Sequence, residues 1–227
     1  MKKVSVVVPA YNEASRIAST LQAIQSNVPC DEIIVVDDGS TDDTAAISKK
    51  LSTTVIRLSK NQGKGAALMR GWEASSGNII LTLDGDLQES ASRATHLLTP
   101  VLQGECDMAI AILPSPTQKA GFGLAKGLAQ KGLKLLTGLH FAAPLSGQRA
   151  FKREVLHTVG KLDRGFGVEV ALTVGAIRAG HHIMEIPVAF SHRQTGNDLQ
   201  GFMHRGKEFL AISRALGSKW REGRRER

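Results

Sequence analysis

Short, β-branched apolar runs alternate with helix-like segments through the first hundred residues, and this alternation constrains the fold most strongly. The predicted strands are Val4–Val8, Ile33–Val36, Val55–Leu58 and Asn78–Leu83. The predicted helices between them are Ala14–Ser26, a segment ending near Leu51, and one running from Gly63 to about Ser75. Strand–helix alternation predicts an α/β fold, a Rossmann-like and mainly parallel sheet flanked by helices on both faces.

The second half of the chain is less regular. Its predicted helices are Ser90–Gln103 (kinked or ended by Pro100), Lys119–Thr137, Val168–Ala179 and Gln200–Leu216. Its predicted strands are Asp107–Leu113 and His182–Val188. Because no repeat or low-complexity linker interrupts the chain, we expect one domain over residues 1–227. Within it we expect a first half over about 1–103, a second half over about 104–218 and a basic tail over 219–227.

Composition narrows the class of protein. The 42% hydrophobic and 22% charged content is that of an ordinary globular protein. Aromatic residues make up only 4%, which argues against stacking platforms for single-stranded nucleic acid, so no nucleic-acid partner is expected. Cys30 and Cys106 are isolated and lack metal-ligand spacing. A reducing, cytoplasmic setting is therefore the default expectation.

The net charge of +8 favours anionic partners. Part of the excess lies in 219–227, which is either a solvated end or, with Trp220, a contact for the inner face of a membrane. No apolar stretch approaches the ~18–20 residues of a membrane-spanning helix. The apolar run after Lys3 is also too short for a signal peptide. Peripheral membrane contact and homo-oligomerisation stay open.

Asp84-Gly85-Asp86 follows the fourth predicted strand directly. In open parallel sheets, ligands bind outside the carboxyl ends of the strands. Carboxylates are ligands for Mg²⁺ or Mn²⁺, and these cations in turn bind phosphate oxygens. The pair therefore indicates a metal-held diphosphate, and the alternative is a solvated acidic turn.

Other polar loops belong to the same predicted edge. Tyr11–Glu13 and Asp37–Ser40 follow the first two strands, and an Asp38 carboxylate can accept from a ribose hydroxyl or a pyrimidine N3–H. In Asn61–Gly65, glycines at a helix start expose N–H groups and Lys64 adds a positive charge, which suits phosphate. The segment lacks P-loop spacing, and its alternative interpretation is a plain helix-start turn.

Four segments together resemble family-2 glycosyltransferases, whose fold is called GT-A. The matching segments, in family order, are Val4–Glu13, Val35–Asp42, Asn61–Ala67 and Leu83–Gln88. The resemblance implies that Asp84 and Asp86 carry the metal, Mg²⁺ or Mn²⁺. It implies a nucleotide-sugar donor held by Pro9, Ala10, Tyr11, Glu13, Asp38, Lys64, Asp84 and Gly85.

The second half bears on the acceptor. Pro144–Phe151 resembles the acceptor-side segment of dolichyl-phosphate-mannose-synthase-like enzymes, and Glu185–Val188 with His192-Arg193 resembles their terminal motif. That resemblance implies acceptor binding by Ser146, Gly147, Gln148, Arg149 and Arg193. Asn197-Asp198 stand where that group has a lysine, which departs from the pattern of polyprenyl-phosphate acceptors.

A second resemblance points to glucosyl-3-phosphoglycerate synthases, which retain configuration. Gly165–Glu169 and His192-Arg193 are similar to their segments. It implies that His192 completes the metal shell, although a lone surface histidine is the alternative. It also implies that Glu169 lies near the reacting centre, so the expected catalytic residues are Asp86, Glu169 and Arg193.

The expected activity is therefore metal-dependent transfer of a hexosyl group from a nucleotide sugar, with UDP-glucose as a guess. Glu169 is followed by Val170, so the acidic pair of many inverting members is missing, and an anionic acceptor such as polyprenyl phosphate or a phosphoglycerate is expected. One alternative is a nucleotidyltransferase, which would need a glycine- and arginine-rich loop where Pro9–Glu13 stands. The other is a non-catalytic membrane-surface protein, which leaves the four ordered motifs unexplained.

Overall fold

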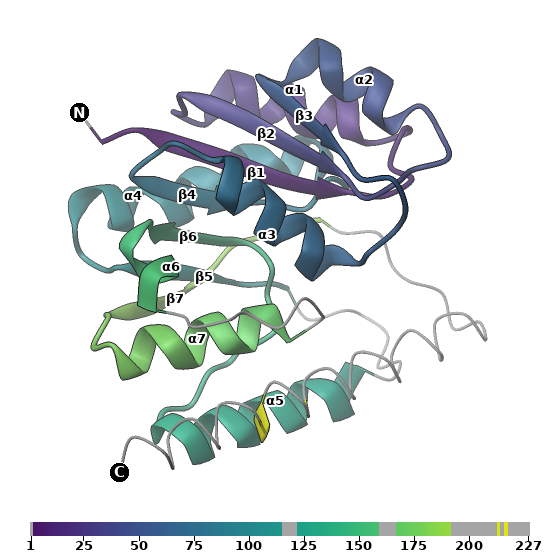
Figure 1. Ribbon diagram of the computed structural model, residues 1–227. Coiled ribbons are helices and arrows are strands. Elements are labelled where there is room, and N and C mark those ends of the chain that lie inside the picture. Colours follow the sequence, from purple (N-terminus) through teal and green to yellow (C-terminus); the bar gives the residue numbers. More distant parts are fainter. Residues whose placement is uncertain (1, 115–121, 159–166, 192–212, 214–215, 218–227) are drawn as a thin grey trace.

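A seven-stranded sheet forms the centre of the molecule in the computed structural model, which describes residues 2–114, 122–158, 167–191, 213 and 216–217 (Figure 1). The sheet order is β3-β2-β1-β4-β6-β5-β7. The strands are β1 (Val4–Ala10), β2 (Glu32–Asp37), β3 (Thr54–Arg57), β4 (Ile79–Thr82), β5 (Met108–Ile112), β6 (Arg149–Lys152) and β7 (Ile183–Pro187).

Most strand pairs are parallel, as predicted. β1 lies parallel to β2 and β4, β2 to β3, and β5 to β7. The exception is β6, which runs antiparallel between β4 and β5 and was not predicted. Its sequence, Arg-Ala-Phe-Lys, has only two apolar residues. The strand exists because β4 and β5, both distant in sequence, supply its partners.

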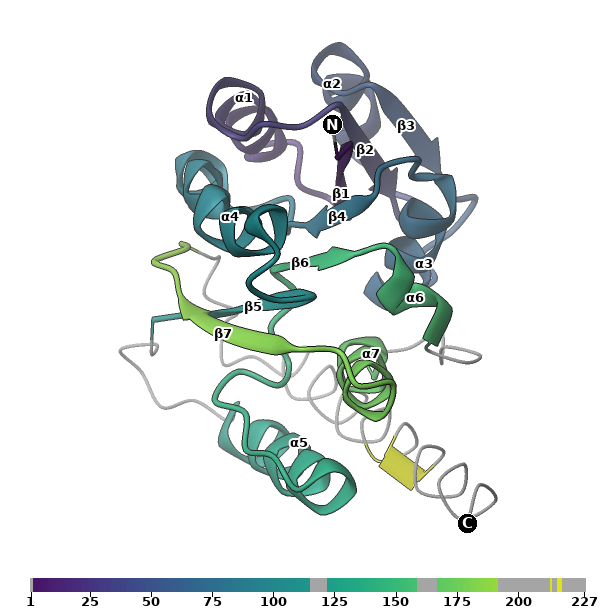
Figure 2. The same cartoon turned by 90° about the vertical axis from the view of Figure 1, so that its left-hand side faces the viewer.

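Helices cover both faces of the sheet, which confirms the predicted architecture (Figures 1 and 2). One face carries α1 (Ile17–Asn27), α2 (Thr44–Leu51), the 3₁₀ helix η1 (Gln88–Ala94) and α4 (Thr95–Gln103). The other face carries α3 (Lys64–Ala74), α6 (Glu154–Thr158) and α7 (Val168–Arg178). Helix α5 (Phe122–Thr137) packs against α7 at the outside of the molecule.

The central strands are buried on both faces, which explains their unbroken apolar sequence. Val6 and Val8 of β1 pack with α1 and α4, whereas Val7 packs with α3 on the opposite face. Trp72 of α3 meets Phe151 of β6 edge to face, with ring centroids 5.7 Å apart. Burial of side chains of this size contributes about 1.5–3 kcal/mol each. The core thus fixes the strands whose ends carry the predicted site.

The predicted helix Ser90–Gln103 proved to be two elements, η1 and α4. Pro100 lies inside α4 and neither ends the helix nor stops it short of Gln103. Leu97, Leu98 and Val101 are fully buried, and their burial offsets the one backbone hydrogen bond that proline cannot make. The predicted helix Gln200–Leu216 lies largely outside the described residues. Among the described helices, none combines the length and apolarity needed to cross a membrane.

Candidate functional site

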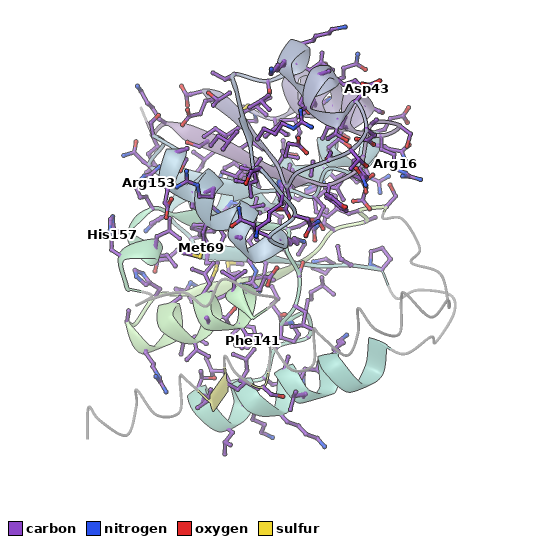
Figure 3. The ribbon with its side chains drawn as sticks, turned by 45° about the vertical axis from the view of Figure 1, so that its right-hand side comes forward. Arg16, Asp43, Met69, Phe141, Arg153 and His157 are labelled. Atoms are coloured by element: carbon purple, nitrogen blue, oxygen red, sulfur yellow. The ribbon has the colours of Figure 1, made fainter. Side chains whose placement is uncertain are left out.

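The loops that follow β1, β2 and β4 meet at one edge of the sheet, as predicted. The Asn12 N–H donates to Ser40 Oγ at 2.9 Å, and Asn12 Oδ1 accepts from the Thr41 N–H at 2.9 Å. The Gly85 carbonyl accepts from Thr20 Oγ1 of α1 at 2.9 Å. In Figure 3, Arg16 and Asp43 lie toward this edge, whereas Arg153 and His157 lie at the other side of the molecule.

The residues predicted to hold a donor after β1 differ in their exposure. Pro9 and Ala10 are buried residues of the strand, and the Ala10 carbonyl accepts from the Asp38 N–H at 2.9 Å. Tyr11 is 44% exposed, and Glu13 forms an ion pair with Arg16 at 3.3 Å. Pro9 and Ala10 therefore support the edge through their backbone, and the Tyr11 ring is the group presented to solvent.

Asp38 organises the loop that leads into α3. Its side chain is buried, and its two oxygens accept from the N–H groups of Gln62 at 2.7 Å and Gly63 at 2.8 Å. Gly63 has a φ of 93°, a left-handed conformation that glycine adopts without strain. This loop places Lys64 at the first position of α3. A bond from Asp38 to a nucleoside would have to use the remaining lone pairs of the carboxylate.

Asp84 joins three segments that are distant in sequence. Its Oδ1 lies 2.5 Å from Lys64 Nζ of α3. Its Oδ2 accepts from Nε2 of Gln148, the residue before β6, at 2.6 Å. The carboxylate that follows β4 is thus held by one group from α3 and one from the segment before β6.

Electrostatic coupling extends this group to α7. Burial alone would lower the pKa of Lys64, but the carboxylates of Asp84, Glu169 and Asp86 hold that pKa above its ordinary value. Burial raises the pKa of Glu169, and the charges of Lys64 and Arg149 oppose that rise. Three carboxylates therefore act on one lysine, an arrangement suited to an additional cation.

Arg149 has a different environment from the one expected of an acceptor ligand. The residue is 2% exposed, and burial lowers the pKa of its guanidinium to about 10. Nε donates to the Ser146 carbonyl, Nη2 to the Pro144 carbonyl, and Nη1 to the Glu169 carbonyl at 2.7, 3.0 and 3.0 Å. These donors are used inside the protein, and the binding of an acceptor by Arg149 stays a prediction. Through these hydrogen bonds, Arg149 links the segment before β6 to α7.

Glu185 is a positioning residue that sequence reasoning missed. This β7 carboxylate accepts from the N–H groups of Ala142 at 2.7 Å and Ala143 at 2.6 Å. Ser146 is buried, and its Oγ donates to Gln148 Oε1 at 3.3 Å, which leaves Nε2 of that amide facing Asp84. The sequence marked the Glu-Ile-Pro-Val motif, but nothing local shows that its glutamate binds a loop 42 residues away.

Several predicted residues lie outside the described part of the chain. These are His192 and Arg193, the motif residues Gly165 and Phe166, and the basic tail 219–227. The third metal ligand, the acceptor arginine and the membrane contact accordingly stay predictions.

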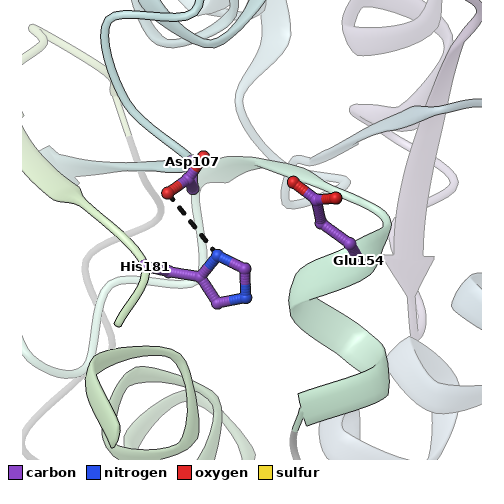
Figure 4. A group of neighbouring side chains, drawn as sticks. All are labelled: Asp107, Glu154 and His181. Atoms are coloured by element: carbon purple, nitrogen blue, oxygen red, sulfur yellow. Dashed lines mark ion pairs between the residues drawn. The ribbon is translucent and has the colours of Figure 1, made fainter. Parts of the chain in front are cut away.

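A second group of possible metal ligands lies at the opposite edge of the sheet, before β5. Oxygen and nitrogen atoms of Asp107, Glu154 and His181 lie within 4.8 Å of one another (Figure 4). Lys152 Nζ lies 2.5 Å from Asp107 Oδ1, and His181 Nδ1 lies 3.5 Å from Oδ2. A cation here would compete with the lysine, and the observed contacts form an ion-pair network that joins the residue before β5, β6 and the segment between α7 and β7.

Together, the sheet and its acidic carboxyl edge define an α/β protein with a site suited to a cation and a phosphate-bearing ligand. The chain belongs to Glycosyl transferase family 2, whose family description matches residues 5–160. This match covers β1 to β6 and contains every loop of the edge described above.

Relatives and solved structures agree with the family. The chain is 31% identical over 218 residues to an undecaprenyl-phosphate 4-deoxy-4-formamido-L-arabinose transferase from Salmonella choleraesuis, with 89% of the chain aligned. It spans 64% of that relative's length. Glucosyl-3-phosphoglycerate synthase from Mycobacterium tuberculosis, solved with Mg²⁺ and UDP, superposes with a TM-score of 0.80 at 29% identity, over 96% of this chain and 79% of that one. The same enzyme with Mn²⁺, UDP and glucosyl-3-phosphoglycerate gives 0.76 at 28% identity, over 95% and 80%.

Proposed function

We propose that this chain transfers a sugar from a uridine-diphosphate sugar to a phosphate-bearing acceptor, with a divalent cation at Asp84 and Asp86. The observation that carries the proposal is the convergence of Lys64, Asp84 and Glu169 at the carboxyl edge of the sheet. The edge combines cation ligands with an ammonium group, and a nucleoside diphosphate needs both.

The residues present fit a divalent cation. Asp84 already holds one positive group, the Lys64 ammonium, and the charges of Asp86 and Glu169 act on the same ammonium. We propose Asp84, Asp86 and His192 as the ligands, with Mg²⁺ or Mn²⁺ as the ion. A cation bound there would neutralise the negative charge that builds on the leaving nucleoside diphosphate.

The donor would lie across the loops of the same edge. The Tyr11 side chain is exposed beside the Asn12–Ser40 contact, where it is available to stack on a base. A Cβ at Gly85 would come within 3.4 Å of Ala10 and Pro9, so a glycine there lets the Asp-Gly-Asp turn lie close to the end of β1. We propose that these groups, with Glu13 and Asp38, hold the nucleoside, while Lys64 meets the diphosphate.

The acceptor is proposed to carry a phosphate, with Arg193 as its ligand. Two comparisons support this class: one relative is an undecaprenyl-phosphate transferase, and the solved neighbour was crystallised with phosphoglyceric acid. The net charge of +8 agrees with an anionic acceptor. Glu169, buried and close to Lys64, is the proposed carboxylate beside the reacting centre.

A thermal-shift screen tests the donor assignment. UDP-, GDP- and ADP-sugars are each added with Mn²⁺ and with a chelator. A ligand at a hundred times its Kd stabilises by about 2.7 kcal/mol, which raises the Tm by about 5 °C for a chain of this size. We expect such a shift for a uridine nucleotide with Mn²⁺ and none with the chelator.

Acceptor assays divide the remaining alternatives. Transfer to 3-phosphoglycerate or to undecaprenyl phosphate would support the proposal and name the acceptor. Release of pyrophosphate from a nucleoside triphosphate and sugar phosphate would instead support the nucleotidyltransferase. Liposome binding without any nucleotide-dependent shift would support a membrane-surface protein and overturn the proposal.

A further inference from the structure

The Lys64 ammonium forms an ion pair with the Asp84 oxygen that a bound cation would use. The ammonium lies 2.5 Å from Asp84 Oδ1, while Gln148 Nε2 lies 2.6 Å from Oδ2. A divalent cation bonded to Asp84 at ~2.0–2.2 Å would lie next to that ammonium, and the two positive charges would repel. Asp84 therefore cannot hold both groups in the arrangement that the structure shows.

The position of the ammonium is shaped by its surroundings. A Cβ built on Gly147 would overlap Lys64 Nζ, and it would come within 3.5 Å of Asp84 Oδ1. The absence of a side chain at Gly147 is thus what leaves room for the ammonium beside the carboxylate. The backbone of Gly147 is held nearby, because its neighbours Ser146 and Gln148 are buried and hydrogen-bonded.

Lys64 is also able to leave this position. It is the first residue of α3, its long side chain is partly exposed, and it follows a glycine loop fixed by Asp38. The N-terminus of a helix favours anions, so a diphosphate bound there would lie within reach of the released ammonium.

We propose that Lys64 is a stand-in counterion for Asp84 that makes cation binding depend on the nucleoside diphosphate. Without nucleotide, the ammonium neutralises the carboxylate and keeps the divalent cation weakly bound. When cation and diphosphate bind together, the cation takes Asp84 and the ammonium moves to the phosphate oxygens. This inference rests on the proposed function and adds an order of binding to it.

Electron paramagnetic resonance of Mn²⁺ tests the proposal without any turnover. The Mn²⁺ affinity of the wild-type chain and of Lys64→Met is measured with and without UDP. We expect Lys64→Met to bind Mn²⁺ alone at least tenfold more tightly than the wild type. We also expect UDP to enhance Mn²⁺ binding at least tenfold less in Lys64→Met than in the wild type.

Two further variants separate a direct exchange from a general effect of charge. Lys60→Met removes one positive charge from an exposed position nearby and should leave Mn²⁺ affinity within twofold of the wild type. Gly147→Ala keeps Lys64 but removes the room for its ammonium, so it should raise the affinity for Mn²⁺ alone several-fold. Circular dichroism melts confirm that each variant is folded.

The outcomes are distinct. Unchanged Mn²⁺ affinity in Lys64→Met overturns the stand-in role, as does a Lys60→Met variant whose Mn²⁺ affinity rises as much as that of Lys64→Met. If the wild type shows no effect of UDP on Mn²⁺ binding, both this inference and the proposed function fail. If UDP enhances Mn²⁺ binding in the wild type and Lys64→Met binds Mn²⁺ like the wild type, only the inference about Lys64 fails. The proposed function is then still supported.

Discussion

At the scale of single residues, Asp84 is the group through which the two halves of the chain meet. Lys64 reaches it from α3, and Gln148 reaches it from the segment before β6. The family resemblance implied that Gln148 binds the acceptor. In the structure, its amide donates a hydrogen bond to Asp84, a proposed metal ligand. Groups that orient a metal ligand typically change metal affinity by 10–100-fold when they are lost.

Replacing Gln148 should therefore weaken metal binding without unfolding the chain. Gln148→Leu removes the donor to Asp84 Oδ2, and we expect Mn²⁺ affinity in the presence of UDP to fall by about tenfold. Isothermal titration calorimetry measures the change, and the exposed Gln103→Leu serves as the matched control. An unaltered Mn²⁺ affinity together with a raised KM for the acceptor would contradict this role and show that Gln148 binds the acceptor.

Arg149 is expected to matter for stability. Arg149→Met removes the donor to two buried carbonyls, those of Pro144 and Ser146, whereas the Glu169 carbonyl keeps the Thr173 hydroxyl as a donor. Each unsatisfied buried acceptor costs about 1–3 kcal/mol, so the free energy of unfolding should fall by about 2 kcal/mol or more. Urea denaturation measures it, with the exposed Arg70→Met as control. A loss below about 1 kcal/mol would contradict the structural role.

At the scale of elements, the strands that local sequence specifies were predictable. β1, β2 and β4 are apolar runs followed at once by polar residues, and their ends also carry the predicted site. β6 was not predictable, because a buried Arg149 is tolerated only where carbonyls from a loop and from α7 surround it. The contact of Gln148 with Asp84 depends on that strand and was hidden for the same reason.

The ion-pair network before β5 gives a prediction about pH. Burial alone would raise the pKa of Asp107, but hydrogen bonds from Lys152 and the His182 N–H hold it below its ordinary value. A lowered folded pKa adds stability above the unfolded value of about 3.9, and this stability is lost as pH falls through the folded pKa.

Lys152→Met should accordingly lose stability only where Asp107 is ionised. We expect the free energy of unfolding to fall by about 1 kcal/mol at pH 7, because the pair is partly buried. The difference from the wild type should shrink below about pH 4. Urea titrations across this range measure it, with the exposed Lys131→Met as control. A deficit that is independent of pH would show that the lysine acts by packing alone.

At the scale of the whole molecule, one sheet joins the proposed nucleotide-binding half to the proposed acceptor half. β6, from the second half, lies between β4 and β5. This position brings Gln148, the residue before β6, into hydrogen-bond contact with Asp84. The family fold was readable from four ordered motifs in the first half. The second half was harder to read, because its contacts join residues that are 40 to 80 positions apart.

The central claim is that the carboxyl edge of this sheet catalyses sugar transfer with a cation on Asp84 and Asp86. The most direct measurement is transfer of a radiolabelled sugar from its UDP donor to 3-phosphoglycerate or undecaprenyl phosphate, with wild type and Asp86→Ala compared in Mn²⁺ and in chelator. We predict Mn²⁺-dependent product with the wild type, and a loss of at least a hundredfold in a folded Asp86→Ala, about 2.7 kcal/mol of transition-state stabilisation. Full transfer by Asp86→Ala, or by the wild type in chelator, would contradict the account.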